Sequence, residues 1–383
     1  MKKKILILTI SHIWFDTRVF YKIVQSLLKM DSKIRLITNN QINSNKKINH
    51  SPDFTYHIIP QKNNKIYILF CFILQAVKFK PDIVICVEPL SLIAGFILKQ
   101  IFKCRLVYDN HEFYVEAFGD KMRELSLGKI SVCLLSKLYW CYESYFAKKA
   151  DSIITVNDHL LKRYKYVNQN VFLCANYLIH DTFKKNDKYI SKEALIKQYD
   201  LIYVGSLAFE RGLNIYLKTA KLFKKNKKPF TFLIIGNFKN LSTEKYFFNY
   251  IKYHHLHEYI IYKPYMPNEQ ALIEMKAAKI GVFMGDVVQC KKYHKTTNMK
   301  IFEYFSQSIP VIVNKLDNLS ELVYKSKGGW TINFDDKALY NLSVRVLNKD
   351  NLVTKKGECG YKYTKKHFIW ENQEPELYEA ILG

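Results

Sequence analysis

The sequence predicts an α/β protein made of two consecutive doubly wound halves, each with a parallel sheet and helices on both faces. The chain has 383 residues, 49% of them hydrophobic, which is enough for two domains. Short β-branched runs alternate with longer amphipathic stretches, the pattern of βαβ units. The alternation stops in a polar stretch at residues 180–197 and then restarts, which predicts a second sheet.

Each half contains five short apolar runs that we expect to form strands. They are residues 5–9, 34–38, 83–87, 106–108 and 153–156 in the first half, and 201–204, 232–235, 260–262, 280–283 and 311–313 in the second. Apolar residues at helical spacing predict a helix over residues 19–28, and residues 368–382 predict a final helix.

The composition narrows the possible partners and compartment. The net charge of +25 predicts an anionic partner, which can be a nucleic acid, a phospholipid surface or a phosphorylated substrate. The eight cysteines show no paired spacing, which indicates buried thiols in a reducing compartment. The longest apolar run, residues 66–77, is too short to span a membrane but suits an interface. We expect a cytoplasmic protein, soluble or peripheral on the cytoplasmic membrane face.

Ligands of open parallel sheets bind beyond the carboxyl ends of the strands, so the residues directly after strands are the candidates. In the second half, residues 205–212 join a strand to a helix beginning near Leu213, where amides and Arg211 can bind a phosphate. The alternative is a glycine turn with a solvated pair of Glu210 and Arg211, which the local pattern alone favours.

A second candidate segment opens the helix near residue 297. Thr297 is a reasonable N-cap, and Lys300 and Glu303 share one helix face. A carboxylate there can accept both hydroxyls of a ribose while the lysine binds a diphosphate. The alternative is an ordinary exposed ion pair.

The first half has ionisable residues after two of its strands. Asp109, His111 and Glu112 follow one strand, where a histidine can exchange a proton near neutral pH, although a surface histidine is the alternative. Asp16 and Arg18 follow the first strand, either as part of this candidate site or as a structural ion pair capping the first helix.

Taken in order, these segments resemble the group 1 glycosyltransferases (glycosyltransferase family 4), which have a GT-B fold. The resemblance covers nearly the whole chain, and its order and spacing are specific. It rests on residues 16–19, 107–112, 150–156, 203–205, 211–212, 300–304 and 309–312.

The resemblance implies two Rossmann-like domains facing a cleft. Residues 1–180 would bind the acceptor, residues 181–365 would bind the nucleotide sugar, and a helix within residues 366–383 would cross back to the first domain. Glu303 would hold the ribose, while Arg211 and Lys300 would hold the diphosphate. The full implied donor site is Gly205, Ser206, Arg211, Thr297, Asn298, Lys300 and Glu303.

The resemblance also implies the chemistry. His111 would lie near the transferred sugar with Asp109 and Glu112 as further catalytic groups, and Asp16 and Arg18 would lie on the acceptor side. The implied activity is hexosyl transfer from a UDP- or GDP-sugar to a glycan or lipid-linked acceptor, with retention, in bacterial-type surface polysaccharide, capsule or lipopolysaccharide synthesis. An anionic membrane surface is an expected partner and a nucleic acid is not. No cofactor or metal is implied, because basic groups and amides stabilise the leaving diphosphate.

The sequence departs from the family pattern at four places. Lys295 stands where the family often has the first glutamate of a pair ending at Glu303, and residues 11–14 replace a glycine-rich turn. Ser206 stands at a position that is frequently arginine, and Arg211 at one that is usually lysine.

Two other functions stay open from the sequence. A nucleotide-sugar 2-epimerase shares the architecture and would differ on the acceptor side. A non-enzymatic protein that binds nucleic acid or membrane would explain the charge of +25, but not Glu303 and Arg211 in two separate post-strand loops.

Overall fold

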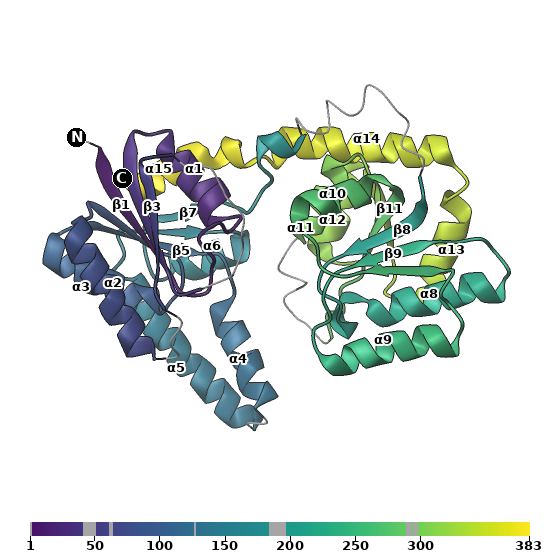
Figure 1. Ribbon diagram of the computed structural model, residues 1–383, viewed down its shortest axis with the longest axis horizontal. Helices are drawn as coiled ribbons and strands as arrows, with labels where there is room; N and C mark the ends of the chain where they lie inside the picture. The colour runs from purple at the N-terminus through teal and green to yellow at the C-terminus, as the bar shows by residue number, and fades with distance from the viewer. Residues whose placement is uncertain are drawn as a thin grey trace. The chain divides into compact units, whose positions relative to one another are not determined.

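The computed structural model describes residues 2–40, 51–60, 64–125, 128–183, 197–288, 293 and 298–383. The chain divides into two compact units (Figure 1). The N-terminal unit is Met1–Asn176 with Trp370–Gly383, and the C-terminal unit is Tyr177–Ile369. The break at residue 176 lies close to the boundary expected after residue 180, and the returning segment begins at Trp370 instead of residue 366.

The N-terminal unit contains a seven-stranded parallel sheet in the order β3-β2-β1-β4-β5-β6-β7. The strands are β1 (Lys3–Thr9), β2 (Ser32–Thr38), β3 (Phe54–Ile58), β4 (Ile83–Cys86), β5 (Arg105–Asn110), β6 (Ser152–Thr155) and β7 (Val171–Leu173). The direction of winding reverses between β1 and β4. Loops that follow these two strands therefore diverge to opposite faces and leave room for a ligand.

Helices cover both faces of this sheet. Figure 1 shows α2 and α3 on one face and α1 and α15 on the other, and α15 contacts β5, β6 and β7. The helices are a π-helix (Val19–Val24), α1 (Gln25–Leu28), α2 (Lys65–Phe79), α3 (Ser91–Phe102), α4 (Tyr114–Glu124), α5 (Lys129–Ala147), α6 (Asp158–Lys165), a 3₁₀ turn (Trp370–Gln373) and α15 (Glu374–Leu382).

The C-terminal unit contains a six-stranded parallel sheet in the order β10-β9-β8-β11-β12-β13. Its winding reverses between β8 and β11. The strands are β8 (Tyr199–Val204), β9 (Phe232–Ile235), β10 (Ile260–Lys263), β11 (Ala278–Phe283), β12 (Val311–Asn314) and β13 (Gly329–Ile332).

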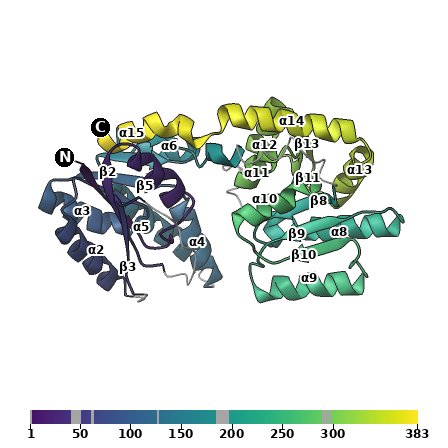
Figure 2. The ribbon, with the colours of Figure 1, turned by 45° about the horizontal axis from the view of Figure 1, so that its top comes forward.

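The long helix α14 packs on the C-terminal unit beside α11 and α12, as Figure 2 shows. Gly357 permits this approach, because a Cβ atom there would lie 1.9 Å from the Ser308 carbonyl oxygen. The helical elements of the unit are a 3₁₀ turn (Phe209–Arg211), α8 (Leu213–Lys225), α9 (Leu241–Tyr253), α10 (Asn268–Lys276), α11 (Met299–Ser306), α12 (Asp317–Ser326), α13 (Asp336–Val346) and α14 (Asp350–His367).

Every strand expected from the sequence is present, and three further strands were not expected. These three, β3, β7 and β13, all lie at sheet edges. Edge strands are partly exposed, so their sequences lack the continuous apolar run that marks a central strand. In β3 only Phe54 is fully buried, and β7 has three residues.

The expectation that the cysteines are buried is wrong for two of them. Cys86, Cys104 and Cys174 are buried, whereas Cys133 and Cys141 are exposed on α5. The cause is that α5 presents an apolar side to solvent.

The ends of β8 and β9 approach each other at two glycines. The Gly205 amide donates to the Ile235 carbonyl at 2.9 Å, and Gly236 has a φ of 148°. A Cβ atom on Gly236 would lie 1.9 Å from the Gly205 carbonyl oxygen. Only glycine therefore fits at this position.

We expect Gly236→Ala to lower the free energy of unfolding by about 3 kcal/mol, because backbone strain and a backbone clash occur together. Urea denaturation measures the loss. Gly128→Ala is the control, since φ is −60° there and a Cβ atom would meet nothing within 4 Å. The control should change stability by less than about 0.5 kcal/mol, and equal losses in both variants would contradict the prediction.

Candidate functional site

Glu88, which follows β4, holds the loop after β1 in place. The Glu88 carboxylate accepts hydrogen bonds from the Thr9 hydroxyl (2.7 Å), the Ser11 hydroxyl (2.6 Å) and the amides of Ile10 and Ser11 (both 3.0 Å). Glu88 is 6% exposed. These bonds fix the backbone that carries His12.

Arg18 and Asp109 form a buried ion pair. Arg18 Nη2 lies 2.6 Å from Asp109 Oδ1 and Nε lies 2.9 Å from Oδ2, while Nη1 donates to the Cys174 carbonyl at 3.1 Å. Burial alone would raise the pKa of Asp109, but the charge of Arg18 holds that pKa well below its usual range. The pair connects the segments after β1 and β7 to the end of β5.

Asp16 caps the first helix of the N-terminal unit. Its Oδ1 accepts from the amides of Arg18 (2.8 Å) and Val19 (3.0 Å). Burial alone would raise the pKa of Asp16, but the hydrogen bond from His12, with help from these amides, lowers it to about 2. The suggested ion pair between Asp16 and Arg18 is thus corrected, because the Arg18 guanidinium pairs with Asp109 instead.

His111 lies beside Asp109 and opposite His12. Its Nδ1 is 3.5 Å from Asp109 Oδ2, and its Nε2 is 3.0 Å from Nε2 of His12. Glu112 is exposed and does not share this cluster. The structure therefore brings His111, Asp109 and Asp16 together around His12, buries Arg18 beneath them and leaves Glu112 in solvent.

Two residues of this cluster were not predicted from the sequence. Glu88 directly follows an expected strand, and that position is the signal that could have found it. His12 follows the first strand, but its partner His111 lies 99 positions away, and no local pattern connects the two.

In the C-terminal unit, Arg211 lies against the turn after β8. A Cβ atom on Gly205 would lie 3.6 Å from Arg211 Nη1 and 3.0 Å from the Tyr203 hydroxyl. Burial raises the pKa of Tyr203 to about 12 although the charge of Arg211 opposes this. Ser206 is exposed, and its carbonyl accepts from the Tyr203 hydroxyl at 2.9 Å. The glycine turn, Ser206 and the guanidinium thus lie close together, an arrangement that can supply hydrogen-bond donors to an anion.

The first turn of α11 carries the other predicted donor residues. Asn298 is its N-cap and accepts from the Lys300 amide at 2.9 Å. Thr297, the N-cap expected from the sequence, lies outside the described residues. Lys300 Nζ donates to Glu303 Oε2 at 2.7 Å, and Glu303 is 8% exposed. The pair is therefore less exposed than an ordinary surface ion pair.

Tyr304 positions α11 beside the end of β8. Its hydroxyl accepts from the Val204 amide at 2.9 Å, and its ring would collide with any side chain at Gly281. Glu303 precedes Tyr304, and Gly205 follows Val204. The Glu303 carboxylate and the glycine turn consequently belong to the same edge of the sheet.

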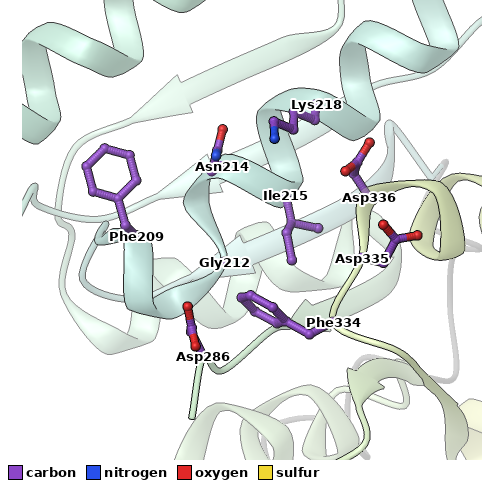
Figure 3. A pocket seen from close by; sticks show the side chains of 9 residues that line it. All are labelled: Phe209, Gly212, Asn214, Ile215, Lys218, Asp286, Phe334, Asp335 and Asp336. Atoms are coloured by element: carbon purple, nitrogen blue, oxygen red, sulfur yellow. The ribbon is translucent and has the colours of Figure 1, made fainter. Parts of the chain in front are cut away.

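A pocket of about 440 Å³ lies near the start of α8 (Figure 3). None of the predicted donor residues within the described part of the chain lines it. It is lined by Phe209, Gly212, Asn214, Ile215, Lys218, Asp286, Phe334, Asp335 and Asp336. Three aspartates against one lysine make the pocket acidic, which disfavours a diphosphate.

The C-terminal unit is similar to a known protein family. Residues 185–363 match the family model described as glycosyl transferases group 1. The chain is a glycosyltransferase with a group 1 domain in its C-terminal unit. No curated protein sequence matches this glycosyltransferase.

Solved structures show the fold of the whole enzyme to be GT-B. Sucrose-phosphate synthase from Thermosynechococcus elongatus has a TM-score of 0.70 and 14% identity over 99% of this chain and 98% of its own. HepE of Anabaena in complex with UDP has a TM-score of 0.68 and 11% identity over 98% of each chain. WaaG, a glycosyltransferase involved in lipopolysaccharide biosynthesis, has a TM-score of 0.68 and 13% identity over 99% of this chain and 100% of its own.

We expect Asp109→Asn to destabilise the glycosyltransferase by about 3–5 kcal/mol at pH 7, because it leaves the buried Arg18 charge without its partner. Since the pKa of Asp109 is depressed in the folded protein, this contribution is present above the unfolded value of about 3.9 and is lost as pH falls below it. Denaturant titrations at pH 7 and at about pH 2.5, below the unfolded value, measure both effects.

Glu112→Gln is the matched control for this prediction, because Glu112 is exposed three residues further on. It should change stability by less than about 0.5 kcal/mol. An Asp109→Asn variant as stable as the wild type would show that the ion pair does not hold the N-terminal site together.

Proposed function

We propose that this glycosyltransferase moves a hexosyl group, with retention, from a UDP- or GDP-sugar to a glycan or lipid-linked acceptor in bacterial-type surface polysaccharide or glycolipid synthesis. The observation that carries the donor assignment is the placement of Arg211 at the glycine turn after β8 with the largely buried Glu303 on the adjacent helix. The similar structure of HepE was solved in complexes with UDP and with UDP-glucose, which supports a nucleotide-sugar donor here.

The donor site follows from the chemistry of a nucleoside diphosphate. Arg211 and the amides of the glycine turn supply donors for phosphate oxygens, and Lys300 adds a second cation. Glu303 supplies two oxygens that can accept both ribose hydroxyls. The same cations would stabilise the charge that develops on the diphosphate as it leaves, so we propose a reaction without a metal or other cofactor.

The N-terminal unit would supply the acceptor side and the groups near the transferred sugar. His111 is the best candidate for contact with the sugar, since a histidine can donate or accept a proton near neutral pH. Asp109 would act by orienting His111. The buried Arg18 has its guanidinium committed to Asp109 and Cys174, so its role would be to hold the site in shape.

We expect Glu303→Ala to weaken nucleoside diphosphate binding by about 1.5–3 kcal/mol, the range for a hydrogen bond to a charged group. Arg211→Ala should weaken diphosphate binding and spare the nucleoside, because Arg211 is proposed to contact only phosphate oxygens. Calorimetry with uridine or guanosine and the corresponding diphosphates separates the two roles.

Two variants serve as controls for the donor site. Arg211→Lys keeps the charge and should recover part of the lost affinity, and Glu274→Gln removes a carboxylate on α10, outside the proposed site. Diphosphate affinity unchanged by Glu303→Ala would remove Glu303 from the donor site. If Arg211→Ala lost the same affinity for the nucleoside as for the diphosphate, the substitution would have disordered the loop after β8.

The N-terminal unit also presents an exposed apolar and basic face, formed by α2 and α5, which both pack against α3. No helix in the described part of the chain is long and apolar enough to cross a bilayer. The apolar side chains recur at helical spacing and are exposed, up to 78% for Ile66 and 87% for Ile130. They are Ile66, Phe70, Leu74, Val77, Ile130, Leu134, Leu138 and Tyr145.

The sequence suggested an interface for residues 66–77, and the apolar residues of this face also come from α5. The exposed basic residues of this face are Lys65, Lys78, Lys129, Lys137, Lys148 and Lys149. Helix α2 contains no Asp or Glu, and the single Glu143 of α5 is buried. Apolar side chains ringed by lysines suit the boundary of an anionic bilayer, so we propose that this face docks on the membrane.

We expect the protein to sediment with anionic vesicles and poorly with neutral ones, because each lysine near an anionic surface contributes about 1 kcal/mol. Added salt should weaken binding by screening, and Phe70→Glu with Leu134→Glu should weaken it at least tenfold at any salt concentration. The control is Ile273→Glu, which changes a residue 68% exposed on α10 of the C-terminal unit. No binding to anionic vesicles at low salt would favour a soluble acceptor.

A further inference from the structure

His12 and His111 meet through the same atom of each ring. The two Nε2 atoms lie 3.0 Å apart, with ring centroids 4.8 Å apart and planes inclined by 62°. The side chains are 22% and 8% exposed, so bulk water does not surround the contact. An imidazole nitrogen either donates through a proton or accepts through a lone pair, and a hydrogen bond of this length needs one of each.

The opposite nitrogen of each ring faces a carboxylate. His12 Nδ1 lies 3.2 Å from Asp16 Oδ2, and His111 Nδ1 lies 3.5 Å from Asp109 Oδ2. A carboxylate beside an imidazole favours a proton on the nitrogen that faces it. If both Nδ1 atoms carry protons and both rings are neutral, the lone pairs of the two Nε2 atoms point at each other and repel. One added proton between the Nε2 atoms replaces this repulsion with a hydrogen bond.

We propose that His12 and His111 share this proton and act as one cationic unit, with His12 as a positioning residue for His111. Nothing in the family resemblance assigned a role to His12. The role of the unit in sugar transfer rests on the proposed function, whereas the shared proton rests on the geometry alone.

The charges around the pair favour retention of the proton. Asp16 and Arg18 face it from the segment after β1, Glu88 from the loop after β4, with an oxygen 3.8 Å from His12 Nε2, and Asp109 from β5. Three carboxylates thus stand against one guanidinium. The shared proton compensates part of that excess negative charge.

Two further groups complete the surroundings. Tyr114 of α4 has its ring centroid 6.2 Å from that of His111 and stays neutral, since burial raises its pKa well above the usual value. Glu112 is exposed to solvent, which screens its charge. Burial alone would lower the pKa of His12, but the hydrogen bond with Asp16 and the charges of Glu88, Asp16 and Asp109 raise it.

The shared proton has a consequence for the site. It holds the His111 ring by a charge-assisted hydrogen bond and places one positive charge at the carboxyl edge of the N-terminal sheet. Above the pH at which the proton leaves, the two rings repel and His111 loses its fixed orientation. We therefore expect sugar transfer to fall on the alkaline side through kcat, with the donor KM little changed.

The direct test is nuclear magnetic resonance of the full chain with ¹⁵N-labelled histidine. We expect a scalar coupling between the two Nε2 nuclei at pH 7. The coupling should be absent from both His12→Asn and His111→Asn. His12 should titrate above the ordinary histidine value of about 6.5, because burial is outweighed by the hydrogen bond with Asp16 and the nearby carboxylates, which raise its pKa. His159→Asn, which changes an exposed histidine on α6 of the same unit, should leave the coupling intact.

The kinetic test compares pH profiles of sugar transfer. His12→Asn should lower kcat by about tenfold to hundredfold, because His111 would no longer be held in position. It should also shift the alkaline limb of the pH–rate profile to lower pH. Absence of the coupling in the wild-type protein, or independent titration of the two rings, overturns the proposal. If no nucleotide sugar is turned over while the coupling is present, the proposed function fails and the shared proton stands.

Discussion

The buried ion pair between Arg18 and Asp109 is the constraint on which the N-terminal site depends. A guanidinium offers its donors in a fixed plane, so it can bind a carboxylate through two nitrogens and still reach the Cys174 carbonyl. Three strand ends are thereby held in one arrangement. The cost of burying two charges is offset because most of their polar atoms find partners, and breaking the pair would leave one charge unsatisfied.

The C-terminal site depends on the absence of side chains. Gly205 and Gly236 let the ends of β8 and β9 approach, and Gly212, with a φ of 81°, turns the chain into α8 where a Cβ atom would lie 2.5 Å from Met284 Cβ. The backbone can then come close to a phosphate, and Arg211 reaches the same turn. The N-terminal site is built by buried charges, whereas the turn of the C-terminal site is built by glycine geometry with Arg211 beside it.

These differences explain what could be predicted from the sequence. Central strands carry continuous apolar runs, so they were predictable. A lysine and a glutamate three positions apart on a helix must share a face, so the ion pair of Lys300 and Glu303 on α11 was predictable too. The edge strand β3 was not, because its exposed positions are polar. The contact between His12 and His111 depends on the register of β1 and β5 through β4, and no local pattern encodes it.

The exposed sides of α2 and α5 show a further limit of sequence patterns. Apolar residues on the inner side of α2, such as Phe72, and on its outer side, such as Phe70, look alike in the sequence, since only packing decides which side is covered.

The pattern on this exposed face also distinguishes between the anionic partners that a charge of +25 allows. A nucleic-acid surface needs basic residues that follow a phosphate backbone, with aromatic or polar groups to meet the bases. Here the large apolar side chains exposed on α2 and α5 are mostly aliphatic, and lysines lie around them. Contact with phosphates gives aliphatic side chains little favourable free energy, whereas burial among the acyl chains of a bilayer removes their apolar surface from water. A bilayer therefore fits this face better than a polynucleotide.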